Sequence, residues 1–167
     1  MKAYIFDIDG TIADLHHRLH FIREQGVADK NKWYEGRPPF KKDYDAFYAA
    51  CMDDKPIQPV ITINQMLWDV DHGDQIAEYG LLFMTGRPEK IRKETLAWMD
   101  NNYVIWHKLY MRPDGDHRPA VKIKAEMYDQ AIADGYEPIM AFEDHTSCVE
   151  MWRSKGLICA QVAEGDF

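Results

Sequence analysis

The sequence predicts an α/β fold in which a parallel β-sheet is covered by helices on both faces. Four short apolar segments recur along the chain, and segments with helical patterns separate the second, third and fourth of them. Near-continuous apolar runs are typical of strands buried on both faces, and parallel strands need crossover helices to connect them. Polar residues directly follow the first three runs, as expected where the carboxyl ends of such strands form a ligand site.

The length and composition agree with one folded domain. The chain has 167 residues, of which 46% are hydrophobic and 29% are charged. This balance is typical of globular domains, and a domain of this length buries enough surface to fold without a metal ion or a disulfide bond. We therefore expect a single domain over residues 1–167.

The strands are expected at residues 3–6, 80–84, 138–142 and 157–162. Each run is short and mainly apolar, and the first one ends at Asp7-Ile8-Asp9-Gly10-Thr11. Apolar runs of this length that are bounded by turn residues favour strands over helices.

The helices are expected at residues 89–101, 122–133 and 146–155. Apolar residues recur in each segment at the spacing of a helical face. Pro88 suits the first turn of the first helix, and Gly156 suits the C-terminal cap of the third. Three large apolar residues of these helices are predicted to lie in the core: Trp98, Met99 and Trp152.

Residues 14–54 do not follow this alternation. The segment is rich in aromatic residues and contains Pro38-Pro39, and within residues 30–42 five basic residues accompany one acidic residue. We expect a small cap inserted after the first strand, above the edge of the sheet, with most of its aromatic residues in a core of its own. The alternative for Trp33 and Tyr34 is that they stack on a nucleic-acid base.

The net charge limits the classes of partner. The chain has 20 Lys and Arg residues against 28 Asp and Glu residues, a formal net charge of −8 with His neutral. An acidic chain repels the phosphate backbone that supplies most non-specific affinity for nucleic acids. We expect no extended nucleic-acid-binding surface, although the basic stretch of the insertion allows a local one.

Cysteine usage and apolar patterning favour a cytoplasmic location. The three cysteines are odd in number and not closely spaced, which favours reduced thiols over a zinc site or a disulfide framework. The apolar runs are too short to cross a membrane, and the first residues lack a signal-peptide pattern.

Polar residues at three strand ends predict a metal-assisted phosphate site. Asp7 and Asp9 are two residues apart, so their carboxylates project to one side of a strand, and a hard cation such as Mg²⁺ would neutralise their repulsion. Thr85-Gly86-Arg87 offers a hydroxyl, backbone N–H groups and a guanidinium fork to a phosphate, and Glu143-Asp144 adds a second acidic pair. Each motif alone also fits a turn, a helix cap or solvated charge, but their occurrence at three strand ends favours the site.

These motifs resemble those of the haloacid dehalogenase (HAD) superfamily, whose phosphotransferases use an aspartate nucleophile. Asp7-Ile8-Asp9-Gly10-Thr11 matches the first motif, Thr85-Gly86-Arg87 the second and Glu143-Asp144 the fourth, in the same order along the chain. The resemblance implies a HAD-like, Rossmannoid sheet, with residues 14–54 as the small cap.

The C-terminal part of the chain has a narrower resemblance. Residues 148–153 and 161–167 are similar to the end of the phosphatase domain of phage polynucleotide kinase-phosphatases. No G-x-x-x-x-G-K-[ST] loop occurs in the sequence, so the resemblance implies a stand-alone relative of that phosphatase half. It also points to a phage source, and the protein would then act in the host cytoplasm.

The resemblance implies a catalytic role for three residues. Asp7 would be the nucleophile that forms an aspartyl-phosphate, and Asp9 would be the general acid and base. A lysine of the third motif would neutralise the phosphate and the nucleophile. Lys122 and Lys124 are both candidates, and comparison with the phage phosphatases favours Lys124, although Ala120 stands where those relatives tend to carry an acidic residue.

The resemblance also assigns ligand-binding residues. Thr85, Gly86 and Arg87 would hold the phosphoryl group, and Arg18 would reach a substrate phosphate. Two further arginines are candidates for substrate contact: Arg112 and Arg118. Four carboxylates would hold Mg²⁺: Asp7, Asp9, Glu143 and Asp144.

The predicted function is that of a Mg²⁺-dependent phosphomonoesterase that removes a terminal phosphate, at the 3′ position, from a polynucleotide or a nucleotide. The partner would be a phosphorylated nucleotide or nucleic-acid end. One alternative is a small-molecule phosphatase of nucleoside monophosphates, which the net charge of −8 favours. A second alternative is a non-catalytic binding module on a HAD scaffold, which the retention of the motif residues opposes.

Overall fold

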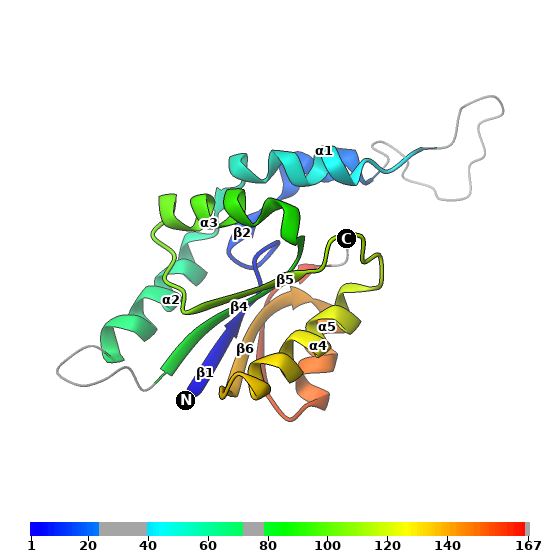
Figure 1. The fold of residues 1–167 in the computed structure, drawn as a ribbon. Coiled ribbons are helices and arrows are strands. Elements are labelled where there is room, and N and C mark those ends of the chain that lie inside the picture. Colours follow the sequence, from blue (N-terminus) through cyan, green and yellow to red (C-terminus); the bar gives the residue numbers. More distant parts are fainter. Residues whose placement is uncertain (24–39, 72–78, 166–167) are drawn as a thin grey trace.

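Five parallel strands form the central sheet of the protein, whose computed structural model describes residues 1–23, 40–71 and 79–165 (Figure 1). The strand order is β5-β4-β1-β6-β7. The strand bounds are Lys2–Phe6 for β1, Tyr79–Pro88 for β4, Lys108–Arg112 for β5, Glu137–His145 for β6 and Ile158–Gly165 for β7.

Two pairs of helices cover the two faces of this sheet (Figure 1). Helices α2 (Gln58–Asp71) and α3 (Arg92–Asn101) pack on one face, and α4 (Ala120–Ala133) and α5 (Thr146–Ser154) pack on the other. The predicted α/β fold, with helices on both faces of a parallel sheet, is therefore confirmed.

The alternation of side chains along β1 divides the core in two. Phe6 stacks between Phe83 and Phe142, with ring centroids at 5.4 and 4.5 Å, on the face covered by α2 and α3. Ala3 and Ile5 belong to the core on the opposite face, beneath α4 and α5. Because successive side chains of a strand point to opposite faces, a strand buried on both sides needs an unbroken apolar run.

The four predicted strands are present, but β5 lies outside the prediction. Its sequence, Lys108-Leu109-Tyr110-Met111-Arg112, begins and ends with a cation and holds a run of three apolar or aromatic residues. The strand lies at the edge of the sheet beside β4, where charged residues are tolerated and even useful against aggregation. A search for long apolar runs therefore misses it.

The three predicted helices are present with shifted boundaries. The segment from residue 89 begins with a 3₁₀ turn, η3 (Glu89–Ile91), before α3 starts, and α4 begins two residues earlier than predicted. Helix α2 lies outside the prediction. No helix within the described ranges combines the length and the apolar character that crossing a membrane requires. The residues predicted for the core are buried: Trp98, Met99 and Trp152.

The described parts of the predicted insertion lie above the carboxyl ends of the strands (Figure 1). They comprise β2 (Ala13–Asp14), which pairs with β3 (Lys55–Pro56), and the helices η1 (His16–Phe21), α1 (Tyr44–Ala49) and η2 (Ala50–Asp53). Leu15, Ile22 and Phe47 form a small core within this part. Trp33, Tyr34 and most of the basic stretch lie outside the described residues, and the boundaries 14–54 stay a prediction.

Candidate active site

A tight loop after β1 sends Asp7 and Asp9 to different partners. The N–H of Asp7 donates to the carbonyl of Phe142 at 3.0 Å, which continues the pairing of β1 with β6. The chain then turns at Gly10, whose φ of 89° suits glycine. The carbonyl of Ile8 accepts N–H groups of the three residues from Thr11 to Ala13, at 2.9–3.2 Å, and closes the turn. Asp7 and Asp9 both line the cavity described below, but their hydrogen-bond partners differ.

Asp7 joins a buried group of three carboxylates at the carboxyl ends of β1 and β6. One ligand oxygen each from Asp7, Glu143 and Asp144 lies within 4.8 Å of the others. The Nζ of Lys124, from α4, lies 2.7 Å from an oxygen of Asp7 and 2.7 Å from an oxygen of Glu143. Lys122 is exposed to solvent, so the structure brings Lys124 to the candidate nucleophile. We call these four residues the carboxylate cluster.

The carboxylate cluster carries more negative than positive charge. Three carboxylates face one ammonium group, so full ionisation leaves two negative charges in excess. Burial raises the pKa of Asp144 to about 7, with Glu143 adding to the rise, and burial likewise raises the pKa of Asp7. Despite burial, Asp7 and Glu143 raise the pKa of Lys124, which stays charged. A divalent cation would balance the excess.

The surroundings of Asp144 fit a hard metal ion. Its Oδ2 atom is buried and has no hydrogen-bond partner among the described residues. The carboxylate is fixed by a close approach of two backbones, since a Cβ on Gly165 would lie 1.8 Å from Oδ2 and one on Gly10 would lie 2.2 Å from it. The donors are carboxylate oxygens, which Mg²⁺ prefers. The cluster thus fits the Mg²⁺ expected from the sequence.

Asp9 belongs to a second network, outside the carboxylate cluster. An oxygen of Asp9 accepts hydrogen bonds from Arg18 at 2.5 Å and from Arg87 at 2.7 Å. Both arginines also donate to Asp54, at 2.7 Å each. We call these four residues the arginine network. Its two acids balance its two bases, so it needs no further cation.

The arginine network keeps Asp9 ionised in the ligand-free protein. Burial opposes the charged form, but Arg87 and Arg18 outweigh it and lower the pKa of Asp9 to about 2. Arg18 and Arg87 are both fully buried. The sequence predicted these two arginines as phosphate ligands and Asp9 as a metal ligand. The structure places all three against one another, and those roles stay predictions.

Asp54 is the residue of this site that the sequence did not reveal. It is buried and contacts Arg18 and Arg87, and its carbonyl accepts the indole N–H of Trp98 at 2.8 Å. It lies 36 positions after Arg18 and 33 before Arg87, so spacing along the chain carries no sign of the contact. An argument from charge balance could have indicated it, because two buried guanidinium groups require more than one carboxylate.

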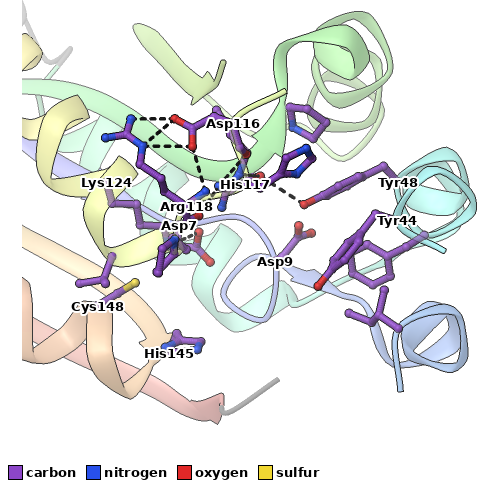
Figure 2. Close-up of a pocket in the computed structure, with 18 of the residues that line it drawn as sticks. Asp7, Asp9, Tyr44, Tyr48, Asp116, His117, Arg118, Lys124, His145 and Cys148 are labelled. Atoms are coloured by element: carbon purple, nitrogen blue, oxygen red, sulfur yellow. Dashed lines mark hydrogen bonds and ion pairs between the residues drawn. The ribbon is translucent and has the colours of Figure 1, made fainter. Parts of the chain in front are cut away.

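A cavity of about 590 Å³ opens beside both networks (Figure 2). Asp7 and Lys124 lie on one side of it, Tyr44 and Tyr48 of α1 lie on the opposite side with Asp9 between them, and Asp116 and His117 of the loop 113–119 lie at the top of the view. Gly86 also lines it, and its carbonyl accepts hydrogen bonds from the hydroxyl of Tyr48 at 3.3 Å and from Arg112 at 2.9 Å. The side chain of Thr85, the residue before Gly86, is buried, and its hydroxyl accepts the N–H of Arg87 at 3.2 Å.

A thiol also lines the cavity. Cys148 lies beside Lys124, and burial raises the pKa of its thiol to about 12, which favours the protonated form. The Asp7 carboxylate, which contacts Lys124 at 2.7 Å, is the candidate nucleophile that the sequence predicts. Arg118, a further sequence candidate, is paired with Asp116 and Glu126 on the cavity rim.

The fold, with carboxylates at the carboxyl edge of the sheet, is similar to that of HAD-like hydrolases. A haloacid dehalogenase-like hydrolase from Streptococcus pneumoniae is similar in fold, with a TM-score of 0.57 and 16% identity over 94% of this chain and 82% of the other. The family model of the polynucleotide kinase PNKP phosphatase domain matches residues 31–167. The chain belongs to this family of HAD phosphatases, as the motifs predicted.

Two proteins that are similar to this chain are longer than it. In the Pnkp1/Rnl/Hen1 complex, a chain 27% identical to this one superimposes with a TM-score of 0.71, over 99% of this chain and 46% of that chain. A putative bifunctional polynucleotide kinase/RNA ligase of Autographa californica nuclear polyhedrosis virus is 30% identical over 74 residues, or 44% of this chain and 11% of the viral protein. This chain therefore spans less than half of these relatives.

Replacement of Asp54 is expected to destabilise the fold. Asp54→Asn leaves two buried guanidinium groups facing Asp9 alone. Removing one partner of a buried ion pair costs about 3–5 kcal/mol, and urea unfolding measures the loss. Asp53→Asn, at the exposed neighbouring position, is the matched control and should change stability little. Equal stability of the two variants would contradict the assignment.

The raised pKa of Asp144 predicts a stability that falls with rising pH in metal-free protein. The folded state holds the proton up to about pH 7, whereas the unfolded carboxyl releases it near about pH 4. Between these values the folded state binds more protons, so stability decreases as the pH rises. Thermal unfolding in EDTA at pH 5 and pH 8 measures the change. Asp144→Asn should flatten the curve, and parallel curves for the two proteins would be the opposite result.

Gly165 is expected to control metal binding through Asp144. A Cβ at this position would lie 1.8 Å from Asp144 Oδ2, so Gly165→Ala must displace the carboxylate. Changes to groups that orient metal ligands weaken affinity by about 10–100-fold, which calorimetric titration with Mg²⁺ detects. The matched test repeats the substitution in an Asp144→Ala background, where the clash is absent. If Gly165→Ala weakens Mg²⁺ binding equally there, it acts by another route.

Proposed function

We propose that the protein is a Mg²⁺-dependent phosphomonoesterase that works in the cytoplasm through an aspartyl-phosphate on Asp7 and removes a 3′-terminal phosphate from a polynucleotide or nucleotide. The observation that carries the proposal is the position of Asp7: its carboxylate contacts Lys124, belongs to the carboxylate cluster and lines the cavity. Membership of the PNKP phosphatase family supports the reaction class and the polynucleotide end.

The first chemical step is attack on phosphorus by an oxygen of Asp7. The bond from phosphorus to the leaving oxygen breaks as the bond to Asp7 forms. Lys124 holds Asp7 in position and offsets the charge of the phosphoryl group. The backbone of Gly86 and the hydroxyl of Thr85 would bind the phosphoryl oxygens. Mg²⁺, held by Asp7, Glu143 and Asp144, would supply the positive charge that lets carboxylates and a phosphate approach one another.

Asp9 would transfer the proton in both steps. It donates a proton to the leaving alcohol and later accepts one from the water that attacks the aspartyl-phosphate and releases inorganic phosphate. The pKa of about 2 leaves Asp9 ionised before substrate binds, which suits the second step but not the first. A phosphate dianion beside it would raise this pKa by repulsion and by drawing on Arg18 and Arg87. Substrate binding would thus prepare the acid.

A second candidate function differs in the size of the substrate. Two of the cations that line the cavity are engaged in ion pairs: Arg118 with Asp116 and Glu126, and Lys90 with Asp45. A cation that is already paired with a carboxylate contributes less electrostatic affinity for the phosphate backbone of a nucleic acid than an unpaired cation does. This observation favours a nucleoside monophosphate, or the last nucleotides of a chain, over a long nucleic acid.

The mechanism is tested by Asp7→Asn. Turnover of a 3′-phosphorylated oligonucleotide should fall by roughly 10³-fold or more, because the covalent route is lost, while circular dichroism stays unchanged. Acid quenching of the unaltered protein with ³²P-labelled substrate should leave label on the peptide that contains Asp7. EDTA should abolish turnover, and added Mg²⁺ should restore it. Asp100→Asn, at an exposed position, is the matched control.

The substrate is tested in the same assay. A 3′-phosphorylated oligonucleotide, its 5′-phosphorylated isomer and a nucleoside 3′-monophosphate are compared at equal concentration. Faster hydrolysis of the first is expected. A clear preference for the mononucleotide would support the second candidate function, and substantial turnover by Asp7→Asn would overturn the mechanism for both.

A further inference from the structure

We propose that Tyr44 and Tyr48 of α1 form a stacking surface for the nucleobase of the nucleotide whose phosphate is removed. The inference rests on the proposed function, because it names what the leaving group of that reaction contains. The two tyrosines line the same cavity as Asp7 and Asp9.

In the proposed mechanism, the position of Asp9 defines the side of the phosphate on which the leaving group would lie. A proton donor must reach the oxygen that departs, and Figure 2 shows Asp9 between Asp7 and the two tyrosines. Burial raises the pKa of Tyr48, and the charge of Asp9 adds to the rise, as expected for groups that lie close together. A leaving alcohol in reach of Asp9 therefore extends toward α1.

The two tyrosines are arranged to present a ring to the cavity. Their rings are stacked, with centroids 6.3 Å apart and planes inclined by 27°. Tyr48 is half-buried and fixed by its hydroxyl, which donates to the Gly86 carbonyl at 3.3 Å. Tyr44 remains 48% exposed at the cavity wall. A fixed aromatic surface loses little conformational entropy when a planar ligand stacks on it.

The aromatic faces of this surface suit a nucleobase, and two of the cations near it are already engaged. Lys90, on the cavity wall, is paired with Asp45, while the Nζ of Lys42 lies 5.9 Å from the centroid of the Tyr44 ring. Arg112 is engaged with the carbonyls of Gly86 and Arg118, at 2.9 and 2.6 Å. Stacking on an aromatic ring needs no free cation and accepts any base, since every base has a π-face.

The competing explanation is that the tyrosines only complete the core of the insertion. Phe47 fills that role, because it is buried with Leu15 and Ile22. Tyr48 packs partly against that core, so its replacement affects the fold as well. Tyr44 is the informative position, because nearly half of its surface remains in solvent.

The test uses two oligonucleotides that differ in one base. Both carry a 3′-phosphate, but the terminal nucleotide of one is abasic. Stacking predicts that the kcat/KM of the wild-type protein is roughly 5- to 100-fold higher for the base-bearing substrate. Tyr44→Ala should bring this ratio close to one, mainly through KM, and Tyr44→Phe should retain it. Tyr103→Ala removes a tyrosine that is 78% exposed and outside this cavity, and should leave the ratio unchanged.

The outcomes separate the inference from the proposed function. Equal kcat/KM values for the two substrates in the wild-type protein overturn the inference alone. A parallel loss with both substrates in Tyr44→Ala, with the ratio preserved, also overturns it, because the residue then acts on the fold. If neither oligonucleotide is hydrolysed while glycerol phosphate is, the proposed polynucleotide function fails, and the inference fails with it.

Discussion

The burial of three carboxylates around one lysine is the interaction on which the other features of the site depend. The strand order places β1 beside β6, so Asp7, which follows β1, meets Glu143 and Asp144 near the end of β6 at the carboxyl edge of the sheet. Lys124 contacts Asp7 and Glu143 but leaves Oδ2 of Asp144 without a hydrogen-bond partner among the described residues. A group of buried like charges destabilises a fold unless a cation or a proton offsets it. Binding of a positively charged ligand would therefore stabilise the folded protein.

Asp7 and Asp9 have contrasting surroundings. The two residues are separated by one position, yet Asp7 belongs to the carboxylate cluster and Asp9 to the arginine network. Their pKa values move in opposite directions, upward for Asp7 and down to about 2 for Asp9. Two carboxylates with separated pKa values are suited to different tasks in one reaction. The arginine network is close to neutral, so the two networks need different compensation.

Apolar runs in the sequence were sufficient to predict the buried strands and the polar residues at their ends. The strand ends that carry Asp7, Thr85-Gly86-Arg87 and Glu143-Asp144 were predictable, because buried parallel strands require apolar runs and place their polar ends together. The edge strand β5 was not, because its apolar run is only three residues long and lies between two cations. The contact of Asp54 with both arginines was not either, because it depends on how the insertion folds back over the sheet rather than on spacing.

The insertion contributes side chains to the site that the sheet does not contain. Asp54 and Arg18 come from it and hold Asp9, while Tyr48 reaches the carbonyl of Gly86 from α1. The sheet and α4 provide Asp7 and the charges around it, which the proposed reaction requires for any phosphomonoester. The remaining wall of the cavity comes from α1 and the loop 113–119. Because many HAD-like hydrolases share the sheet, discrimination between substrates must come from such added elements, and here the same insertion also contacts Asp9 through Arg18. If Asp9 transfers the proton as proposed, substrate choice and proton transfer depend on one segment of the chain.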